Sequence, residues 1–267
     1  MKLRWIFILL AALAVWTGNG HAADNKPASP TEKFAVLISG TTDARFRKNL
    51  GNVYRMLLKK GYRQENIFIL DWKGSKSDDY PVTGPAHWQS ISKTFSQVDR
   101  KILAAKENNR KTDFFIYVTD HGIRDLRLLY VDGKYATGYF SEVILAYDQY
   151  IDEVNFAYDV NAMHFDRGIF IFAQCYGGGF AWRLAGKNRI SIAASAPEEQ
   201  SWDLPPQTSF TDDFLRALEN PEADLNGDGK VDITEAFHRA QVQSSDKKPN
   251  KDTPLIQVGS EIEDLDL

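Results

Sequence analysis

The chain has 267 residues, of which 43% are hydrophobic and 12% aromatic, and its formal net charge at pH 7 is −4. This composition is typical of a packed globular protein and excludes a largely disordered chain. The negative charge argues against nucleic acid or an anionic membrane as the main partner, and the length suits one sizeable domain with a small addition.

The first segment in chain order is an export signal, predicted over residues 1–22. Two basic residues precede an apolar stretch at residues 5–16, and small residues before Ala23 offer a cleavage site. The apolar stretch is too short for a comfortable transmembrane span, so we favour cleavage over an uncleaved anchor. We therefore expect a periplasmic or secreted protein with no membrane contact once the signal is removed.

Apolar segments alternate with amphipathic ones along the rest of the chain. Strands are predicted at residues 33–39, 66–70, 114–118, 169–173 and 190–194. Helices are predicted at residues 50–58, 90–108, 141–154, 179–185, 210–218 and 234–242, with a hairpin-like excursion at 128–133. Most of these strands are continuously apolar, which is typical of a parallel sheet covered on both faces. The pattern predicts an α/β fold with a mostly parallel central sheet flanked by helices.

Cys175 is the only cysteine in the chain, and it directly follows an apolar strand. Three glycines come one residue later, which indicates a turn with room for a ligand. A lone thiol in an exported protein cannot form an internal disulfide and is open to oxidation, which favours a functional role. The alternative is a small buried side chain that only packs near the strand end.

His121 also lies just past the C-terminal end of an apolar strand, where ligands bind in folds of this kind. An imidazole can take the thiol proton of Cys175 and later protonate a leaving amine. The backbone N–H groups of Gly122 and Cys175 are candidates for stabilising an oxyanion. His164 is an alternative partner, although it precedes a strand. A structural zinc site is disfavoured because it needs more thiolate and imidazole ligands.

Three segments together resemble the legumain family of cysteine peptidases. Residues 115–122 are similar to its histidine block, residues 168–180 to its cysteine block, and residues 190–202 to the strand and loop that follow. The resemblance runs from residue 34 to residue 202 and implies a caspase-like fold in a bacterial member. It also implies that Cys175 is the nucleophile and His121 the acid and base, with cleavage after asparagine or aspartate.

The chain departs from the legumain pattern two positions before the cysteine and in the basic cluster after the first strand, which in that family helps to bind the substrate's asparagine. Ala173 stands where legumains usually carry an acidic residue. The resemblance implies that Arg45 or Arg47 binds the substrate side chain and that Asp43 orients the histidine, while Ser195 is a further substrate-binding candidate. Both arginines can equally be ordinary solvated charges.

Residues 224–235 match the twelve-residue EF-hand calcium loop, with glycine at the sixth position. The candidate ligands are the side chains of Asp224, Asn226, Asp228, Asp232 and Glu235 and the carbonyl of Lys230. Because one such loop is visible where sensors are usually paired, we expect a structural site of weak affinity for Ca²⁺. The alternative is an acidic turn that binds no metal.

The predicted organisation is a signal peptide at 1–22, a caspase-like peptidase domain at 33–210, an EF-hand-like segment at 211–245 and a C-terminal tail at 246–267. The last residues of this tail, 261–267, are acidic, and we expect them to be loose. The predicted function is that of an exported cysteine endopeptidase acting on peptides or proteins through a thioester acyl-enzyme, with no cofactor for catalysis. Three alternatives stay open: a catalytically silent peptide-binding relative, a calcium-dependent interaction protein, and a transpeptidase that uses the same dyad.

Overall fold

The computed structural model describes residues 31–127, 130–131, 134–135, 139–147, 149–202, 209–246, 252–262 and 265–267. The predicted signal peptide lies outside these residues. Among the helices that the structure describes, none has the length and apolar character that crossing a membrane requires.

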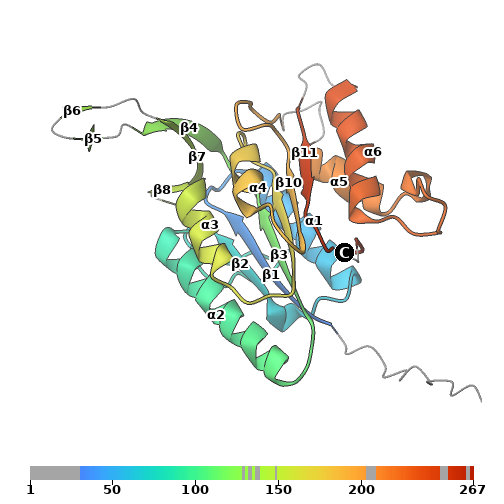
Figure 1. Cartoon of the computed structure of the whole chain (residues 1–267). Helices are drawn as coiled ribbons and strands as arrows, with labels where there is room; N and C mark the ends of the chain where they lie inside the picture. Colours follow the sequence, from blue (N-terminus) through green and yellow to red (C-terminus); the bar gives the residue numbers. More distant parts are fainter. Residues whose placement is uncertain are drawn as a thin grey trace, which may run out of the picture.

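A six-stranded sheet forms the centre of the molecule, in the order β11-β10-β9-β3-β1-β2 (Figure 1). Its strands are β1 (Glu32–Ser39), β2 (Ile67–Asp71), β3 (Thr112–Val118), β9 (Arg167–Phe172), β10 (Arg189–Ala193) and β11 (Leu255–Val258). Strands β1, β2, β3, β9 and β10 pair in parallel, and β11 runs antiparallel to β10. The mostly parallel sheet that the apolar runs predict is confirmed.

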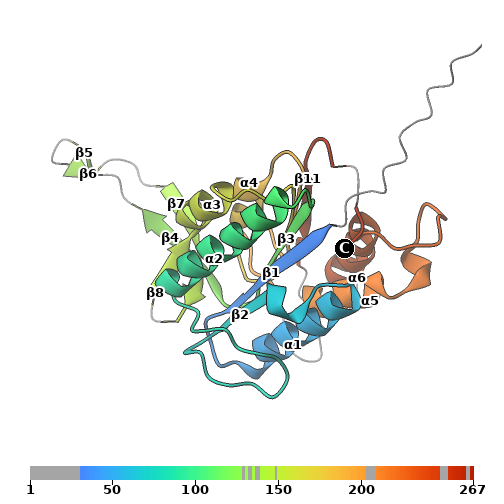
Figure 2. The ribbon, with the colours of Figure 1, turned by 90° about the horizontal axis from the view of Figure 1, so that it is seen from below.

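Helices cover both faces of this sheet (Figure 2). One face carries α1 (Ala44–Lys59), α5 (Phe210–Leu218) and α6 (Ile233–Asp246), and the other carries α2 (Trp88–Glu107), α3 (Glu153–Asn161) and α4 (Gly178–Leu184). Along β1, Leu37 packs toward the first set of helices and Val36 toward the second. Since successive side chains of a strand point to opposite faces, two buried faces make the strand apolar throughout.

The helix predicted over residues 141–154 is wrong for most of its length. The structure has β7 (Tyr139–Ala146) and β8 (Gln149–Asp152), which join β4 (Gly122–Arg127) in a small antiparallel sheet, and α3 follows. Ile144 lies opposite Ile151 in this sheet, and both side chains are buried. The spacing of apolar residues here also fits a helix, so pairing between strands decided the local structure.

The excursion predicted at residues 128–133 lies between β4 and β7. Strands β5 (Tyr130–Val131) and β6 (Lys134–Tyr135) pair there as an antiparallel ribbon. The rest of the predicted segment, at residues 128–129 and 132–133, lies outside the described residues.

The expectation of a loose C-terminal tail is also wrong where the structure describes it. Strand β11 is an edge strand of the central sheet. Beyond it, the carbonyl of Leu265 accepts a hydrogen bond of 3.1 Å from the N–H of Ile233, and Leu267 is buried in the core beside α6. Three apolar side chains lie among the acidic residues of this segment and pack against the core: Ile262, Leu265 and Leu267. Burial of their apolar surface holds the segment against the domain.

Candidate active site

His121 and Cys175 lie at the same edge of the central sheet because their strands are neighbours in register. Strands β3 and β9 pair in parallel, and their last paired residues are Val118 and Phe172. A hydrogen bond of 2.8 Å from Ala173 N to the Val118 carbonyl continues the pairing by one step. His121 lies three positions beyond Val118 and Cys175 lies three positions beyond Phe172, so both residues follow the same end of the paired strands.

Gly122 brings the two loops into direct contact. A Cβ atom on this residue would lie 2.0 Å from the carbonyl oxygen of Cys175, so no larger residue fits without displacing the backbone. The N–H of Gly122 also lies close enough to the Cys175 sulfur to favour a thiolate there. The backbone amide of Gly122 therefore lies next to the Cys175 sulfur.

The Cys175 thiol is held by the backbone of a third loop. Its sulfur donates to the carbonyl of Ser201 and accepts from the N–H of the same residue, both at 3.4 Å. Burial raises the pKa of the Cys175 thiol, and the negative charge of Asp252 acts in the same direction, against the N–H groups of Ser201 and Gly122. The thiol is therefore neutral at neutral pH in this state.

His121 is fixed from two sides. Its backbone N–H donates to Asp120 Oδ1 at 2.7 Å, and its ring meets the Phe46 ring edge-on with 5.1 Å between centroids. Burial lowers the pKa of His121, and the positive charge of Arg45 lowers it further against the opposing effect of Asp43. A neutral imidazole is the form that accepts a proton from a thiol.

Asp120 ties the loop that carries His121 to the loop after β1. Its other carboxylate oxygen accepts from the N–H of Gly40, and the side chain is buried. Burial raises the pKa of Asp120 to about 7, although the N–H groups of Gly40 and His121 favour its charged form. The sequence does not distinguish Asp120 from other polar loop residues, because its burial and its bond to Gly40 depend on the tertiary structure.

The two arginine candidates each have a carboxylate partner. Asp43 caps α1 through the N–H of Arg45 at 3.1 Å and pairs with the Arg45 guanidinium at 3.0 Å. Arg47 pairs at 2.9 Å with the buried Asp71, which also accepts a 3.0 Å hydrogen bond from Tyr80. These pairings offset much of the positive charge of the two guanidinium groups.

Ser195 is in a different position from the one expected of a substrate-binding residue. Its side chain is fully buried, and its hydroxyl donates to the carbonyl of Gln174 at 3.5 Å. A buried Ser195 supports the loop that carries Cys175 and is not open to a substrate side chain, contrary to the expectation.

The alternative partner, His164, is at the other edge of the sheet. It precedes β9, whereas Cys175 follows this six-residue strand, and such a strand spans roughly 20 Å. The His164 ring lies 3.1 Å from Asp99 and is exposed. The structure leaves His121 as the histidine at the edge of Cys175.

The predicted calcium loop connects the helical pair α5 and α6. Gly229 has φ of +85°, which permits the sharp turn, and Asp224 accepts the N–H groups of Gly227 at 2.7 Å and Gly229 at 2.9 Å. Glu235 accepts the N–H of Leu225 at 2.8 Å. Among the described residues, no group of three or more His, Cys, Asp or Glu side chains is placed to hold a metal ion. The backbone of the loop follows the EF-hand motif, while the carboxylates of Asp224 and Glu235 accept hydrogen bonds from N–H groups of the loop itself.

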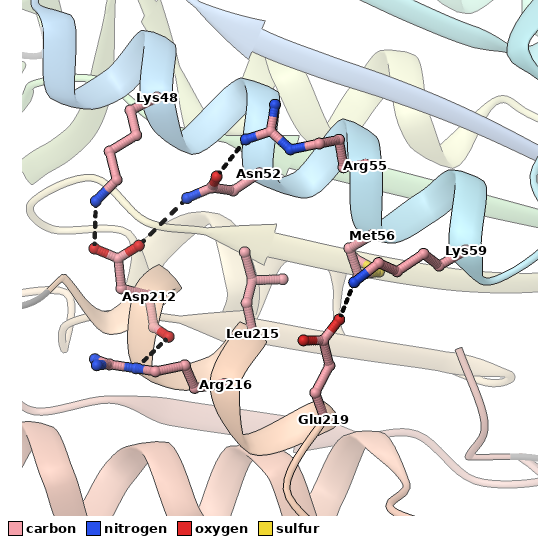
Figure 3. A pocket seen from close by; sticks show the side chains of 9 residues that line it. All are labelled: Lys48, Asn52, Arg55, Met56, Lys59, Asp212, Leu215, Arg216 and Glu219. Atoms are coloured by element: carbon pink, nitrogen blue, oxygen red, sulfur yellow. Dashed lines mark hydrogen bonds and ion pairs between the residues drawn. The ribbon is translucent and has the colours of Figure 1, made fainter. Parts of the chain in front are cut away.

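A groove of about 380 Å³ lies between α1 and α5, away from the candidate catalytic residues (Figure 3). Lys48 pairs with Asp212 at 3.3 Å, and Lys59 pairs with Glu219 at 2.6 Å. The groove is lined by Lys48, Asn52, Arg55, Met56, Lys59, Asp212, Leu215, Arg216 and Glu219. These ion pairs connect α5 with α1.

Residues 33–253 match the family model of the peptidase C13 family. The chain belongs to this family, the legumain family of cysteine peptidases. It is a cysteine-type peptidase with a caspase-like fold, as the resemblance implied. The matched segment continues past the predicted peptidase domain and includes the predicted calcium segment.

Solved structures show the same architecture as this C13 peptidase. The chain is similar to caspase-1 from Spodoptera frugiperda, with a TM-score of 0.54, 11% identity and coverage of 87% of this chain and 89% of that chain. It is also similar to the protein GSU0716 from Geobacter sulfurreducens, with a TM-score of 0.55, 13% identity and coverage of 84% and 92%. A sequence comparison with curated proteins finds no match. At these identities the structural likeness shows the fold alone.

Proposed function

We propose that this C13 peptidase is an endopeptidase in which Cys175 is the nucleophile and His121 is the general acid and base. The observation that carries the proposal is the contact between Gly122 and Cys175, which joins the thiol, the imidazole loop and two backbone donors in one place. Such a combination of nucleophile, base and oxyanion donors is what acyl transfer requires.

The reaction begins from a neutral thiol and a neutral imidazole. A substrate segment takes over the Ser201 backbone groups that hold the thiol in the free enzyme. The sulfur of Cys175 then attacks the carbonyl carbon of the substrate while the thiol proton passes to His121. The oxyanion that forms accepts hydrogen bonds from the N–H groups of Gly122 and Cys175. When the C–N bond breaks, His121 gives that proton to the leaving amine and a thioester remains.

Hydrolysis of the thioester completes the cycle. His121 takes a proton from a water molecule, whose oxygen attacks the thioester carbonyl, and the C–S bond breaks. The proton returns to the sulfur, so that the free carboxylic acid leaves and the neutral thiol is restored. No net change in oxidation state occurs, and water is the only co-reactant.

We further propose that the bond cleaved follows asparagine in preference to aspartate. Arg45 and Arg47 are the candidates for contacting the substrate side chain, and each is paired with a carboxylate, Asp43 and Asp71 respectively. A pocket with little net positive charge gains less from a carboxylate than from a neutral amide, whose desolvation costs less.

Calcium binding and export are further proposals. The loop at 224–235 has the residue order and glycine turn of the EF-hand, and gathering its carboxylates around Ca²⁺ would exchange their amide hydrogen bonds for metal ligation. Export rests on the basic and apolar residues that precede Ala23. N-terminal sequencing of the processed protein tests export, with Ala23 as the expected first residue.

The decisive experiment is cleavage of a peptide library by the protein without residues 1–22, in reducing buffer with calcium. Cys175→Ala and His121→Ala are expected to abolish cleavage, with His164→Ala as the matched control that keeps it. Cleavage that persists in Cys175→Ala would overturn the proposal. The residue before each cut reports directly on asparagine against aspartate.

A further inference from the structure

Two adjacent residues of the C-terminal segment, Asp252 and Thr253, hold the loop that borders the nucleophile. The N–H of Trp202 donates to Asp252 Oδ1 at 2.7 Å. The Thr253 hydroxyl accepts the N–H of Ala196 at 3.0 Å and donates to the Glu199 carboxylate at 2.7 Å. Both ends of the segment 196–202 are thus fastened to residues about fifty positions later in the sequence.

The same segment touches the nucleophile between these two attachment points. Ser201 holds the Cys175 sulfur through both its backbone groups, and the carbonyl of Glu199 accepts the N–H of Tyr176 at 2.8 Å. The loop that Asp252 and Thr253 hold therefore carries the backbone groups that contact the sulfur.

Asp252 also acts on the thiol through its charge. The residue is completely buried, and its negative charge is among the causes that keep the Cys175 pKa high. A buried carboxylate interacts more strongly with a neighbouring group than an exposed one, because water screens it less. Hydrogen bonding to a backbone N–H does not itself require a charge, so Asp252 has two separable effects on the site.

The pair is anchored independently of the loop that it holds. The N–H of Asp252 donates to the carbonyl of Ser244 on α6 at 3.4 Å, and the residues that follow form β11 on the central sheet. Its support thus comes from a helix and a strand, which are more rigid than a loop and suit a positioning role.

We propose that Asp252 and Thr253 are positioning residues of the peptidase reaction, which set Ser201 at the distance from Cys175 that productive binding of the substrate backbone requires. The inference rests on the proposed function and assigns a part in the reaction to the C-terminal segment. Asp252 supplies both the fixed acceptor and the buried negative charge, and Thr253 supplies the second attachment without a charge.

The test compares Asp252→Asn, Asp252→Ala and Thr253→Val with the wild type in peptide cleavage and in iodoacetamide labelling across pH. Labelling reports on Cys175 alone, since the chain has no other thiol. Glu261→Gln is the matched control, because it removes a negative charge from an exposed ion pair in the same segment. Thermal unfolding of every variant identifies any that fails to fold.

We expect Asp252→Asn to shift the labelling curve to lower pH, because the isosteric amide removes the charge and keeps an acceptor. Asp252→Ala is expected to lower kcat/KM about 100-fold, since loss of alignment by about 1 Å has an effect of that size. Thr253→Val should raise KM, and because it removes no charge its labelling curve should shift less than that of Asp252→Asn. Glu261→Gln should match the wild type in both assays.

An Asp252→Asn labelling curve that coincides with the wild type, together with unchanged cleavage by folded Asp252→Ala, would overturn the inference. If Asp252→Ala does not fold, the labelling curves decide alone. The inference then requires the curve of Asp252→Asn to lie at lower pH than that of Thr253→Val. A wild-type protein that cleaves nothing would count against the proposed function instead, because the labelling shift does not depend on peptidase activity.

Discussion

The carbonyl oxygen of Cys175 lies only 2.0 Å from the position that a Cβ atom on Gly122 would occupy. The absence of a side chain at Gly122 thus allows the histidine loop and the cysteine loop to meet. We expect Gly122→Ala to lower kcat by about 10²–10³-fold, because the clash displaces the backbone N–H that is proposed as an oxyanion donor. Gly186→Ala is the control, because the nearest atom to its Cβ would be 3.7 Å away. Equal kcat values for the two variants would contradict this account.

The protonation states of Cys175 and His121 predict a distinctive pH dependence of alkylation. Burial raises the pKa of the Cys175 thiol and lowers that of the His121 imidazole, so the free enzyme holds the neutral pair. Because the thiolate is the species alkylated, labelling should be slow at pH 7 and rise through the alkaline range. His121→Ala should label at the wild-type rate at pH 7. A fast plateau at neutral pH that depends on His121 would show an ion pair instead.

Asp120 predicts a change of stability with pH. Its pKa is about 7 in the folded protein against 3.8 ordinarily, so between these values the folded state binds more protons than the unfolded state. The contribution of Asp120 to the free energy of unfolding is therefore full below about pH 4 and is lost as pH rises through about 7. Asp120→Asn has no such titration. The melting temperature of the wild type relative to Asp120→Asn should fall from pH 5 to pH 8, and parallel curves would refute the assignment.

Arg47 predicts a specificity effect confined to the substrate side chain. We expect Arg47→Ala to raise KM for peptides with asparagine before the cut by about tenfold, as for a lost charge-assisted hydrogen bond of about 1.5 kcal/mol. Arg55→Ala on the outer face of α1 is the control, and its KM should equal that of the wild type. If both variants behave alike, Arg47 does not contact the substrate.

Calcium should stabilise the protein through the loop at residues 224–235. A ligand at 100 times its Kd adds about 2.7 kcal/mol to the free energy of unfolding, which corresponds to a rise in melting temperature of roughly 5–10 °C for a chain of this size. Asp228→Ala should remove this rise, whereas Glu222→Gln, just outside the loop, should keep it. A melting temperature that does not respond to calcium or to chelator would exclude the site.

The fold class and the family followed from local features of the sequence. Continuous apolar runs such as residues 114–118 can be satisfied only by burial on both faces of a sheet, so their character alone predicts the parallel core. His121 and Cys175 were recognisable because each lies within three residues of the end of such a run, where the chain leaves the sheet. These conclusions do not depend on contacts between segments that are distant in the sequence.

Other features depended on tertiary contacts that no short segment encodes. Strands β7 and β8 form where a helix was predicted because β7 pairs with β4 and with β8. Leu267 is buried because it packs in the core beside α6. Asp252 reaches the cysteine site from the far end of the chain, with about fifty residues between it and Trp202. The sequence alone determined which chemistry the chain carries, since residue types and apolar runs are local. The tertiary structure decided which groups position that chemistry, because burial and charge at a point depend on every segment that packs there.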